Sequence, residues 1–206
     1  MNPLSVSSSS TRGPAEHEIR DQIVAAANEH FSQHGYSKTT VSDLAKAIGF
    51  SKAYIYKFFD SKQAIGEAIC SNCLSQIIAA VEEAINAVGI SPTERFRRLV
   101  KSLITKGVDL FFNDRKLYDI AAFSASERWP SSQVYDMRIK HFVLQIVREG
   151  RELGEFERKT PLDETVESIH LALRPYINPL LLQHNLDVVE EAPGLISSLI
   201  LRSLMP

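Results

Sequence analysis

Cysteine, glycine and tryptophan are scarce in this chain, and these shortages exclude several classes of protein. The 206 residues include two cysteines, nine glycines, nine prolines and one tryptophan. Two cysteines cannot build a disulfide framework, which favours a reducing compartment. The low glycine and proline content excludes a collagen-like or mainly disordered chain. A chain of this length can instead bury a hydrophobic core of its own.

Long hydrophobic runs and a strong net charge are missing as well. No run approaches the roughly 18 apolar residues that span a bilayer, so we expect no membrane helix. Residues 5–10 hold five serines where a secretory leader would be apolar, and we expect residues 1–13 to be a disordered arm. The 23 basic and 25 acidic side chains give a net charge of −2, which by itself argues against a nucleic-acid binder.

The chain does have helical periodicity throughout. Apolar residues recur at steps of three and four, and no stretch alternates as a strand would. Pro14 and Gly35 bound the first helix, and the sequence Ser91-Pro92-Thr93-Glu94 is a capping box that starts another. We predict an all-α fold, with later helices near 115–125, 135–153, 162–185 and 193–204. Pro175 and Pro179 should break or kink the helix that contains them.

Residues 36–62 predict two short helices joined by a tight turn. Thr40 can cap the first helix, with Asp43 three residues later, and the apolar face repeats at i, i+3, i+4 and i+7. Ala45 is small where the second helix must pack closely, and Gly49 permits the sharp turn. These are the requirements of a helix-turn-helix.

The distribution of charge removes the objection raised by its total. Residues 36–62 hold five lysines and two aspartates, a local net charge of +3. Residues 161–206 hold two arginines and six acidic residues, a local net charge of −4. A basic face can bind phosphates, while an acidic far end is repelled and helps to orient the encounter.

The helix-turn-helix segment also carries a specific set of motif residues. They are Gly35-Tyr36, Thr39-Thr40-Val41, Ala45, Gly49, Ser51-Lys52, Tyr56, Phe59 and Ser61-Lys62. On these residues the stretch from about Ile19 to Cys70 resembles the N-terminal domain of the TetR/AcrR family of bacterial transcriptional regulators. The resemblance implies a homodimer on a palindromic operator, with two recognition helices in successive major grooves. It also implies a helical C-terminal domain that binds a small-molecule effector, and a ligand-responsive regulator, most often a repressor.

The resulting domain prediction has three parts. Residues 1–13 form the arm, 14–62 the DNA-binding domain, and 63–206 the effector-binding and dimerisation domain. The alternative function is a helix-turn-helix regulator that a protein partner controls, or one without any effector. A well-formed, partly polar cavity in the C-terminal domain would favour a small-molecule effector.

Seven residues are predicted to contact DNA, namely Thr40, Lys52, Ala53, Tyr54, Tyr56, Lys57 and Lys62. Lys57 can donate to guanine O6 or N7 in the major groove. Tyr56 resembles the family's tyrosine that donates its hydroxyl to a phosphate, and Thr40 can both cap a helix and donate to a phosphate. Lys62 should contact the DNA backbone. The second-rank candidates are Tyr36, Ser37, Thr39 and Ser42.

Eight residues are candidates for lining the effector pocket, namely Phe111, Tyr118, Phe123, Trp129, His141, Phe142, His170 and Arg174. Aromatic residues at such spacing also pack in ordinary cores, so that interpretation stays open. Arg174 lies one turn after His170 in an apolar segment, so we expect it to be buried. A buried arginine needs a partner, such as an acidic ligand or a carboxylate across the dimer.

Other features point to no additional chemistry. Cys70 and Cys73 have no second pair or nearby histidine to complete a zinc site, so we predict no metal and interpret them as buried reduced thiols. The sequence shows no carboxylate pair, nucleophile–base spacing or phosphate loop, so we predict no enzyme and no cofactor.

The basic residues between Arg95 and Lys106 are interpreted as a solvated helix face, near the DNA-binding head. We expect a cytoplasmic protein whose partners are DNA, a second copy and an effector, with no membrane.

Overall fold

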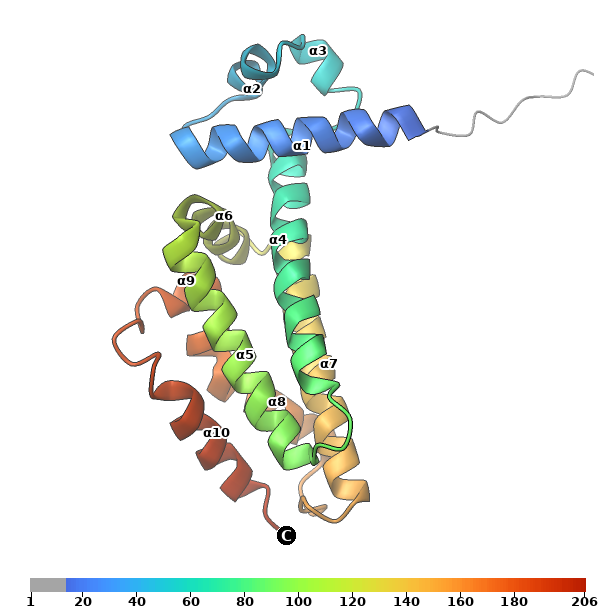
Figure 1. Cartoon of the computed structure of the whole chain (residues 1–206), viewed down its shortest axis with the longest axis vertical. Helices are drawn as coiled ribbons and strands as arrows, with labels where there is room; N and C mark the ends of the chain where they lie inside the picture. Colours follow the sequence, from blue (N-terminus) through green and yellow to red (C-terminus); the bar gives the residue numbers. More distant parts are fainter. Residues whose placement is uncertain (1–13) are drawn as a thin grey trace, which may run out of the picture.

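The regular structure of the described chain consists of helices, arranged as a small head on a longer body (Figure 1). The computed structural model describes residues 14–206, and it contains ten helices and no strand within that range. The predicted all-α fold is therefore confirmed. The predicted arm, residues 1–13, lies outside the described residues.

The head is built from three helices, α1 (Pro14–His34), α2 (Val41–Ile48) and α3 (Lys52–Ile55). In α1 the side chains of Ile23, Ala27 and Phe31 recur every four residues, and all three are fully buried. Leu44 of α2 and Ile55 of α3 are also fully buried in the same core. This single apolar cluster fixes the two short helices, which are too short to be stable alone.

The body follows with α4 (Lys62–Ile85), α5 (Pro92–Asn113), α6 (Arg115–Ser126), α7 (Pro130–Glu152), α8 (Leu162–Ile177), α9 (Pro179–Leu182) and α10 (Ala192–Ser203). Figure 1 shows α4 running from the head down through the body, with α5 and α7 beside it. The predicted boundary between residues 62 and 63 falls in the first turn of α4. Head and body are thus joined by a continuous helix.

The hydropathy of α4 bears on the expectation that the chain has no membrane helix. By length and composition this helix could cross a membrane, because an 18-residue window reaches a mean hydropathy of 1.4. Its apolar side chains, including Ile69, Leu74 and Val81, are buried in the core. The core helix of a water-soluble protein passes the same test, so the burial accounts for the apolar composition.

The segment predicted over 162–185, with a break or kink at its prolines, consists of two helices. Pro175 is accommodated inside α8, but Pro179 starts a new helix, α9. Asn178 between them is extended, with φ −86° and ψ 121°. The residue before a proline is disfavoured in the helical region, which ends α8 at Ile177.

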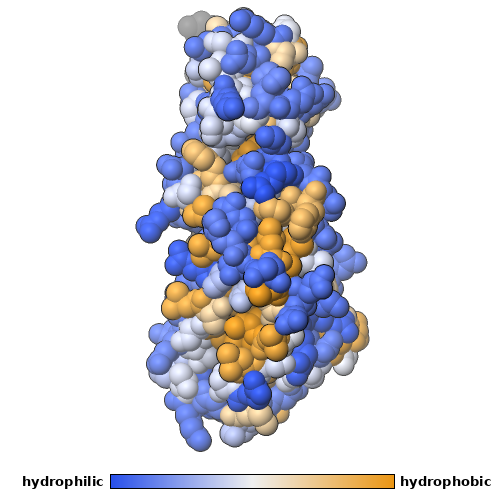
Figure 2. Space-filling model, turned by 90° about the vertical axis from the view of Figure 1, so that its left-hand side faces the viewer, coloured by the Kyte–Doolittle hydropathy of each residue, from blue (hydrophilic) through white to orange (hydrophobic). Residues whose placement is uncertain are grey.

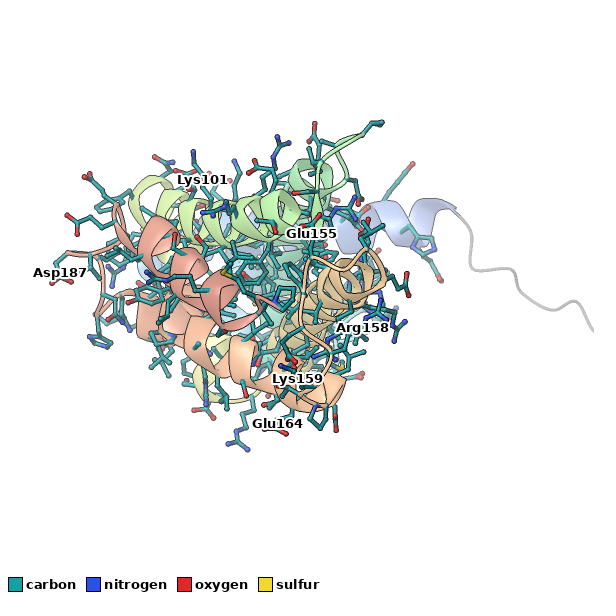
Figure 3. The ribbon with its side chains drawn as sticks, turned by 90° about the horizontal axis from the view of Figure 1, so that it is seen from below. Lys101, Glu155, Arg158, Lys159, Glu164 and Asp187 are labelled. Atoms are coloured by element: carbon teal, nitrogen blue, oxygen red, sulfur yellow. The ribbon has the colours of Figure 1, made fainter. Side chains whose placement is uncertain are left out.

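The first residues of the basic cluster on α5 lie farther from the head than we expected. The helix begins at the end of the body opposite the head, so Arg95 and Arg98 are far from α3 (Figure 1). Arg95 pairs with Glu149 of α7, and Arg98 Nε donates to Glu94 Oε1 at 2.9 Å. Glu94 therefore completes an ion pair instead of the predicted capping box, in which only the Ser91 side chain takes part. Figure 3 shows Lys101 pointing outward from α5.

Candidate nucleic-acid interface and ligand cavity

The turn between α2 and α3 is fixed by hydrogen bonds at both ends of α2. Thr40 Oγ1 accepts from the Asp43 backbone N–H at 3.2 Å, and the Thr40 N–H donates to Asp43 Oδ2 at 2.9 Å. This reciprocal pair is the predicted capping box. At the other end, Gly49 has a left-handed backbone with a φ of 80°, and the Phe50 N–H donates to Ala45 O at 2.9 Å. These bonds set the direction in which the chain enters α3.

The short α3 presents one buried side chain and an open basic face. Ile55 is fully buried in the head core, whereas Lys52, Ala53 and Lys57 are exposed. Tyr56 is 42% exposed. The Lys52 Nζ lies 5.8 Å from the centroid of the Tyr56 ring. Four of the predicted DNA contacts are thus brought together on or next to α3, on a surface that a duplex can reach.

Tyr54 supports this face instead of standing free on it. The residue is half-buried, and its ring meets the rings of Phe50 and Phe58 edge-on, with centroids 5.0 and 5.3 Å apart. Lys57 Nζ lies 5.5 Å from the centroid of the Tyr54 ring. The Phe50 and Phe58 rings therefore hold the Tyr54 ring in place, and Lys57 lies over that ring.

Thr40 and Lys62 already have partners within the head. Thr40 Oγ1 donates to Asp43 Oδ2 at 2.7 Å, so a phosphate would have to replace that carboxylate. Lys62 Nζ donates to the backbone oxygen of Tyr36 at 3.1 Å and lies 4.3 Å above the centroid of its ring. Burial lowers the pKa of Lys62. These two predicted contacts therefore also stabilise the head.

Arg20 is a supporting residue that the sequence reasoning missed. Its guanidinium donates to the backbone oxygen of Phe58 at 2.7 Å and lies 4.1 Å from the centroid of the Phe59 ring. These contacts tie the end of the α3 segment to α1. A basic residue on the exposed side of a helix gives no sequence signal for a bond to a residue 38 positions away.

An aromatic joint formed by Tyr36, Phe123 and Trp129 connects the head to the body. The ring centroids of these three residues lie 5.3 to 5.5 Å apart. Gly66 of α4 makes room for them, since a Cβ there would lie 2.8 Å from Tyr36 and 2.9 Å from Trp129. Burial and the nearby Glu67 carboxylate raise the pKa of Tyr36 to about 12. Two predicted effector residues, Phe123 and Trp129, therefore lie in this joint, together with a second-rank DNA candidate.

The body contains a cavity of about 430 Å³ between α6, α7, α8 and the start of α9. His170 and Arg174 are the two predicted effector residues among those that line it. His170 is 4% exposed, and its Nε2 lies 3.4 Å from Asp136 Oδ1. Arg174 is exposed, so the expectation of a buried arginine is wrong.

The remaining effector candidates lie elsewhere in the body. Phe142 is buried in the main core, and His141 is exposed on α7. Tyr118 donates its hydroxyl to the backbone oxygen of Pro179, and the Phe111 ring lies 4.9 Å from the Tyr118 ring. The structure therefore gives these four aromatic and imidazole side chains packing or surface positions, outside the cavity lining.

The two cysteines are free and buried in α4, which confirms their interpretation as buried thiols. Burial raises the pKa of Cys70, and it raises the pKa of Cys73 to about 12. Both thiols are therefore protonated at neutral pH. Within residues 14–206 no group of three or more histidine, cysteine, aspartate or glutamate side chains is placed to hold a metal ion.

Comparison with known families covers both parts of the chain. Residues 23–69 match the family of bacterial regulatory proteins of the tetR type, and residues 92–192 match the tetracyclin repressor-like C-terminal domain. Over 59 residues the chain is 37% identical to IcaR of Staphylococcus aureus, an HTH-type negative transcriptional regulator of the biofilm operon icaADBC. That match spans 29% of this chain and 32%, about a third, of IcaR.

Solved structures extend the likeness to nearly the whole chain. The TetR family regulator PfmR of Thermus thermophilus is 26% identical, with a TM-score of 0.58 over 89% of this chain and 99% of PfmR. FadR of Bacillus subtilis, solved in complex with stearoyl-CoA, is 19% identical, with a TM-score of 0.66 over 89% of this chain and 98% of FadR. These relatives are transcriptional regulators and not enzymes. Family models match residues 23–69 and 92–192, and the helix-turn-helix is formed. This chain is therefore a DNA-binding transcriptional regulator of the TetR family.

Proposed function

We propose that this protein is a repressor that binds a palindromic operator as a homodimer and leaves it when a small molecule binds to the body. The capped helix-turn-helix, with Lys52, Tyr56 and Lys57 on its open face, is the observation that carries the proposal. The printed description of IcaR as a negative regulator supports repression, since the match to IcaR covers the DNA-binding head.

An apolar face on α10 supports the homodimer. Leu195 and Leu199 are 66% and 58% exposed, and with Tyr176 and Val188 they line a groove of about 260 Å³. Figure 2 shows apolar side chains gathered on the lower half of the side of the molecule where α10 lies. A second copy is the occupant that the proposal requires, because a palindrome needs two heads related by a twofold axis.

The cavity in the body supports a small-molecule effector over the alternative of a protein partner or no effector. Its volume of about 430 Å³ lies within the usual range for ligand pockets, about 300–1,000 Å³. The related fold of FadR was solved with stearoyl-CoA bound, which supports ligand control in proteins of this shape. We place the protein in the cytoplasm, where the DNA lies and where its thiols stay reduced.

The test is to select an operator from random duplexes and to compare variants on matched and scrambled sites. Lys57→Ala should lower the preference for the selected site by about 1–3 kcal/mol, because it removes a base contact. Tyr56→Phe should weaken binding to both duplexes about equally, because it removes a phosphate contact. Lys101→Ala, on the outer face of α5, is the matched control and should change neither affinity.

Two results would contradict the proposed interface. One is an unchanged affinity in both Lys57→Ala and Tyr56→Phe. The other is a loss in the Lys101→Ala control as large as that in Lys57→Ala. The repressor assignment is tested separately, by placing the selected operator across a promoter and measuring transcription with and without the protein. Increased transcription with the protein would contradict repression.

A further inference from the structure

The cavity between α6, α7, α8 and α9 contains cationic side chains that lack acidic partners. Lys140 Nζ is paired with Glu167 Oε2 at 2.6 Å, so these two charges compensate each other. Arg128 and Arg174 also line the cavity, and neither side chain makes an ion pair or hydrogen bond within residues 14–206. The Asp136 carboxylate also lines the cavity, so the two arginines leave its lining with one excess positive charge. That excess favours an anion, and planar guanidinium donors suit a carboxylate.

His170 provides an unused polar atom in the same cavity. The side chain is 4% exposed, and its Nε2 is buried without a hydrogen bond within the described chain. The nearest carboxylate oxygen, Asp136 Oδ1, lies 3.4 Å away but does not form a hydrogen bond of acceptable geometry. Buried polar atoms are normally bonded, so this nitrogen is a second and independent indication of a missing ligand.

Part of the cavity lining is apolar. Leu74 of α4, Ala121 and Ala125 of α6, and Leu171 of α8 contribute to it. Ligand pockets generally combine such surface with a few polar groups that fix orientation. A ligand that satisfies both parts has one carboxylate and a short hydrocarbon portion.

Arg128 connects this cavity directly to the aromatic joint. It has a φ of 54°, and it is the one residue other than glycine with a positive φ in the described chain. A bulky residue in the left-handed region is strained, and such strain is often found where a site must switch. The next residue, Trp129, packs against Tyr36 of the head at 5.4 Å between ring centroids.

We propose that the cavity binds a small organic carboxylate, whose charged group lies between Arg128 and Arg174 next to His170. The hydrocarbon portion lies against Leu74 and the alanines of α6. Binding repositions Arg128, and Trp129 transmits that movement to the head. The inference rests on the proposed function, because this carboxylate is then the effector that releases the DNA.

The probes are two acids and their neutral amides, hexanoate with hexanamide and benzoate with benzamide. Calorimetry on the full chain without DNA measures affinity, and Trp129 emission reports the joint, because the chain has a single tryptophan. We expect at least one acid to bind about tenfold or more tightly than its amide and to change the emission. If no acid binds, if acid and amide bind alike, or if binding leaves the emission unchanged, the inference is wrong.

Variants then test the individual residues. Arg174→Gln should weaken the acid about tenfold and leave the amide unchanged, and Arg128→Asn should do the same while tolerating the left-handed backbone. Arg148→Gln is the matched control on α7, since Arg148 is exposed and outside the cavity lining, and it should bind as the wild type does. Unaltered acid binding in both cavity variants would overturn the inference. Dissociation of the dimer by Arg174→Gln would overturn it too, by assigning this arginine to the dimer interface.

The two proposals fail in different ways. Operator affinity of the ligand-free protein tests the DNA-binding repressor, and calorimetry without DNA tests the carboxylate site. Operator binding without carboxylate binding would contradict this inference alone. Carboxylate binding without operator binding would contradict the proposed function alone.

Discussion

Gly150 allows close packing at the end of the body opposite the head, because it has no Cβ. The ring of Phe156 packs directly on the Gly150 Cα, and Phe156 is 3% exposed. The backbone oxygen of Gly150 accepts hydrogen bonds from the Glu155 N–H at 2.8 Å and the Phe156 N–H at 3.1 Å. The close approach of ring and backbone lets the chain turn tightly after α7.

Gly150→Ala should lower the free energy of unfolding by about 1–3 kcal/mol, because the new methyl group overlaps a ring that cannot leave its buried site. Denaturant titration measures the loss. The double variant Gly150→Ala with Phe156→Leu should lose less than the sum of the two single changes, since the smaller side chain makes room. Additive losses would mean that ring and methyl group do not clash.

Residue contacts could be predicted where the partners are near in sequence. Thr40 and Asp43 are three residues apart, and the spacing alone indicated their reciprocal bonds. Lys62 and Tyr36 are separated by 26 residues, so no local pattern reveals their bond. The apolar neighbours of Arg174 in sequence predict a buried side chain, but Arg174 is exposed.

The α2 helix depends on its N-terminal cap, and the cap depends on pH. Hydrogen bonds from the Thr40 side chain and backbone lower the pKa of the Asp43 carboxyl, with smaller contributions from Lys46 and His30. A carboxyl with a lowered pKa stabilises the fold while it is charged. Its contribution is therefore complete above the pKa of the unfolded chain, about 3.9, and is lost as the pH falls through the lower folded value.

Asp43→Asn should therefore destabilise the protein at pH 7 and make less difference in acid. The melting temperatures of wild type and variant, measured from pH 7 to pH 3, should converge below about pH 4. Thr40→Ala, which removes the hydroxyl partner, should reduce the effect of Asp43→Asn in the double variant. A difference between wild type and Asp43→Asn that stays constant down to pH 3 would contradict this role for the carboxylate.

Helix positions were easier to predict than helix lengths. The signals at Pro14, Gly35 and Ser91 are local, and the helices start and stop near them. The predicted break near Pro179 is observed, but its consequence, a separate four-residue α9, depends on packing against α6. The shortness of α3 likewise reflects tertiary packing, since Ile55 is held in the head core while the chain turns toward α4.

At the scale of the whole molecule, the charges separate along the chain but not into two uniform ends. The basic part of the head is residues 36–62, with a local net charge of +3. The α1 helix carries four acidic side chains and one arginine, so the head as a whole is close to neutral. At the other end, Figure 3 shows Lys159 near Glu164 in the view from below, so a basic residue partly offsets the acidic ones of α8. Electrostatic steering by the acidic end should therefore be weaker than the local net charge of −4 over residues 161–206 implies.

The cavity proposed to bind the effector is the part of the molecule that sequence reasoning located least well. It is assembled from α4, α6, α7, α8 and α9, so its lining is set by how distant helices pack. Aromatic spacing selected Phe111, Tyr118 and Phe142, which serve the packing of the body instead. Arg128 was missed because a basic residue in a short connection between helices resembles any surface residue.

The central claim is that two copies of this chain read one operator through their α3 helices. Sedimentation of the protein with its selected duplex tests it most directly. We expect the free protein to be a dimer and the complex to contain two chains per duplex, and Lys57→Ala should remain a dimer while losing preference for the selected site. A monomer that binds the selected duplex one to one with full affinity would contradict the account.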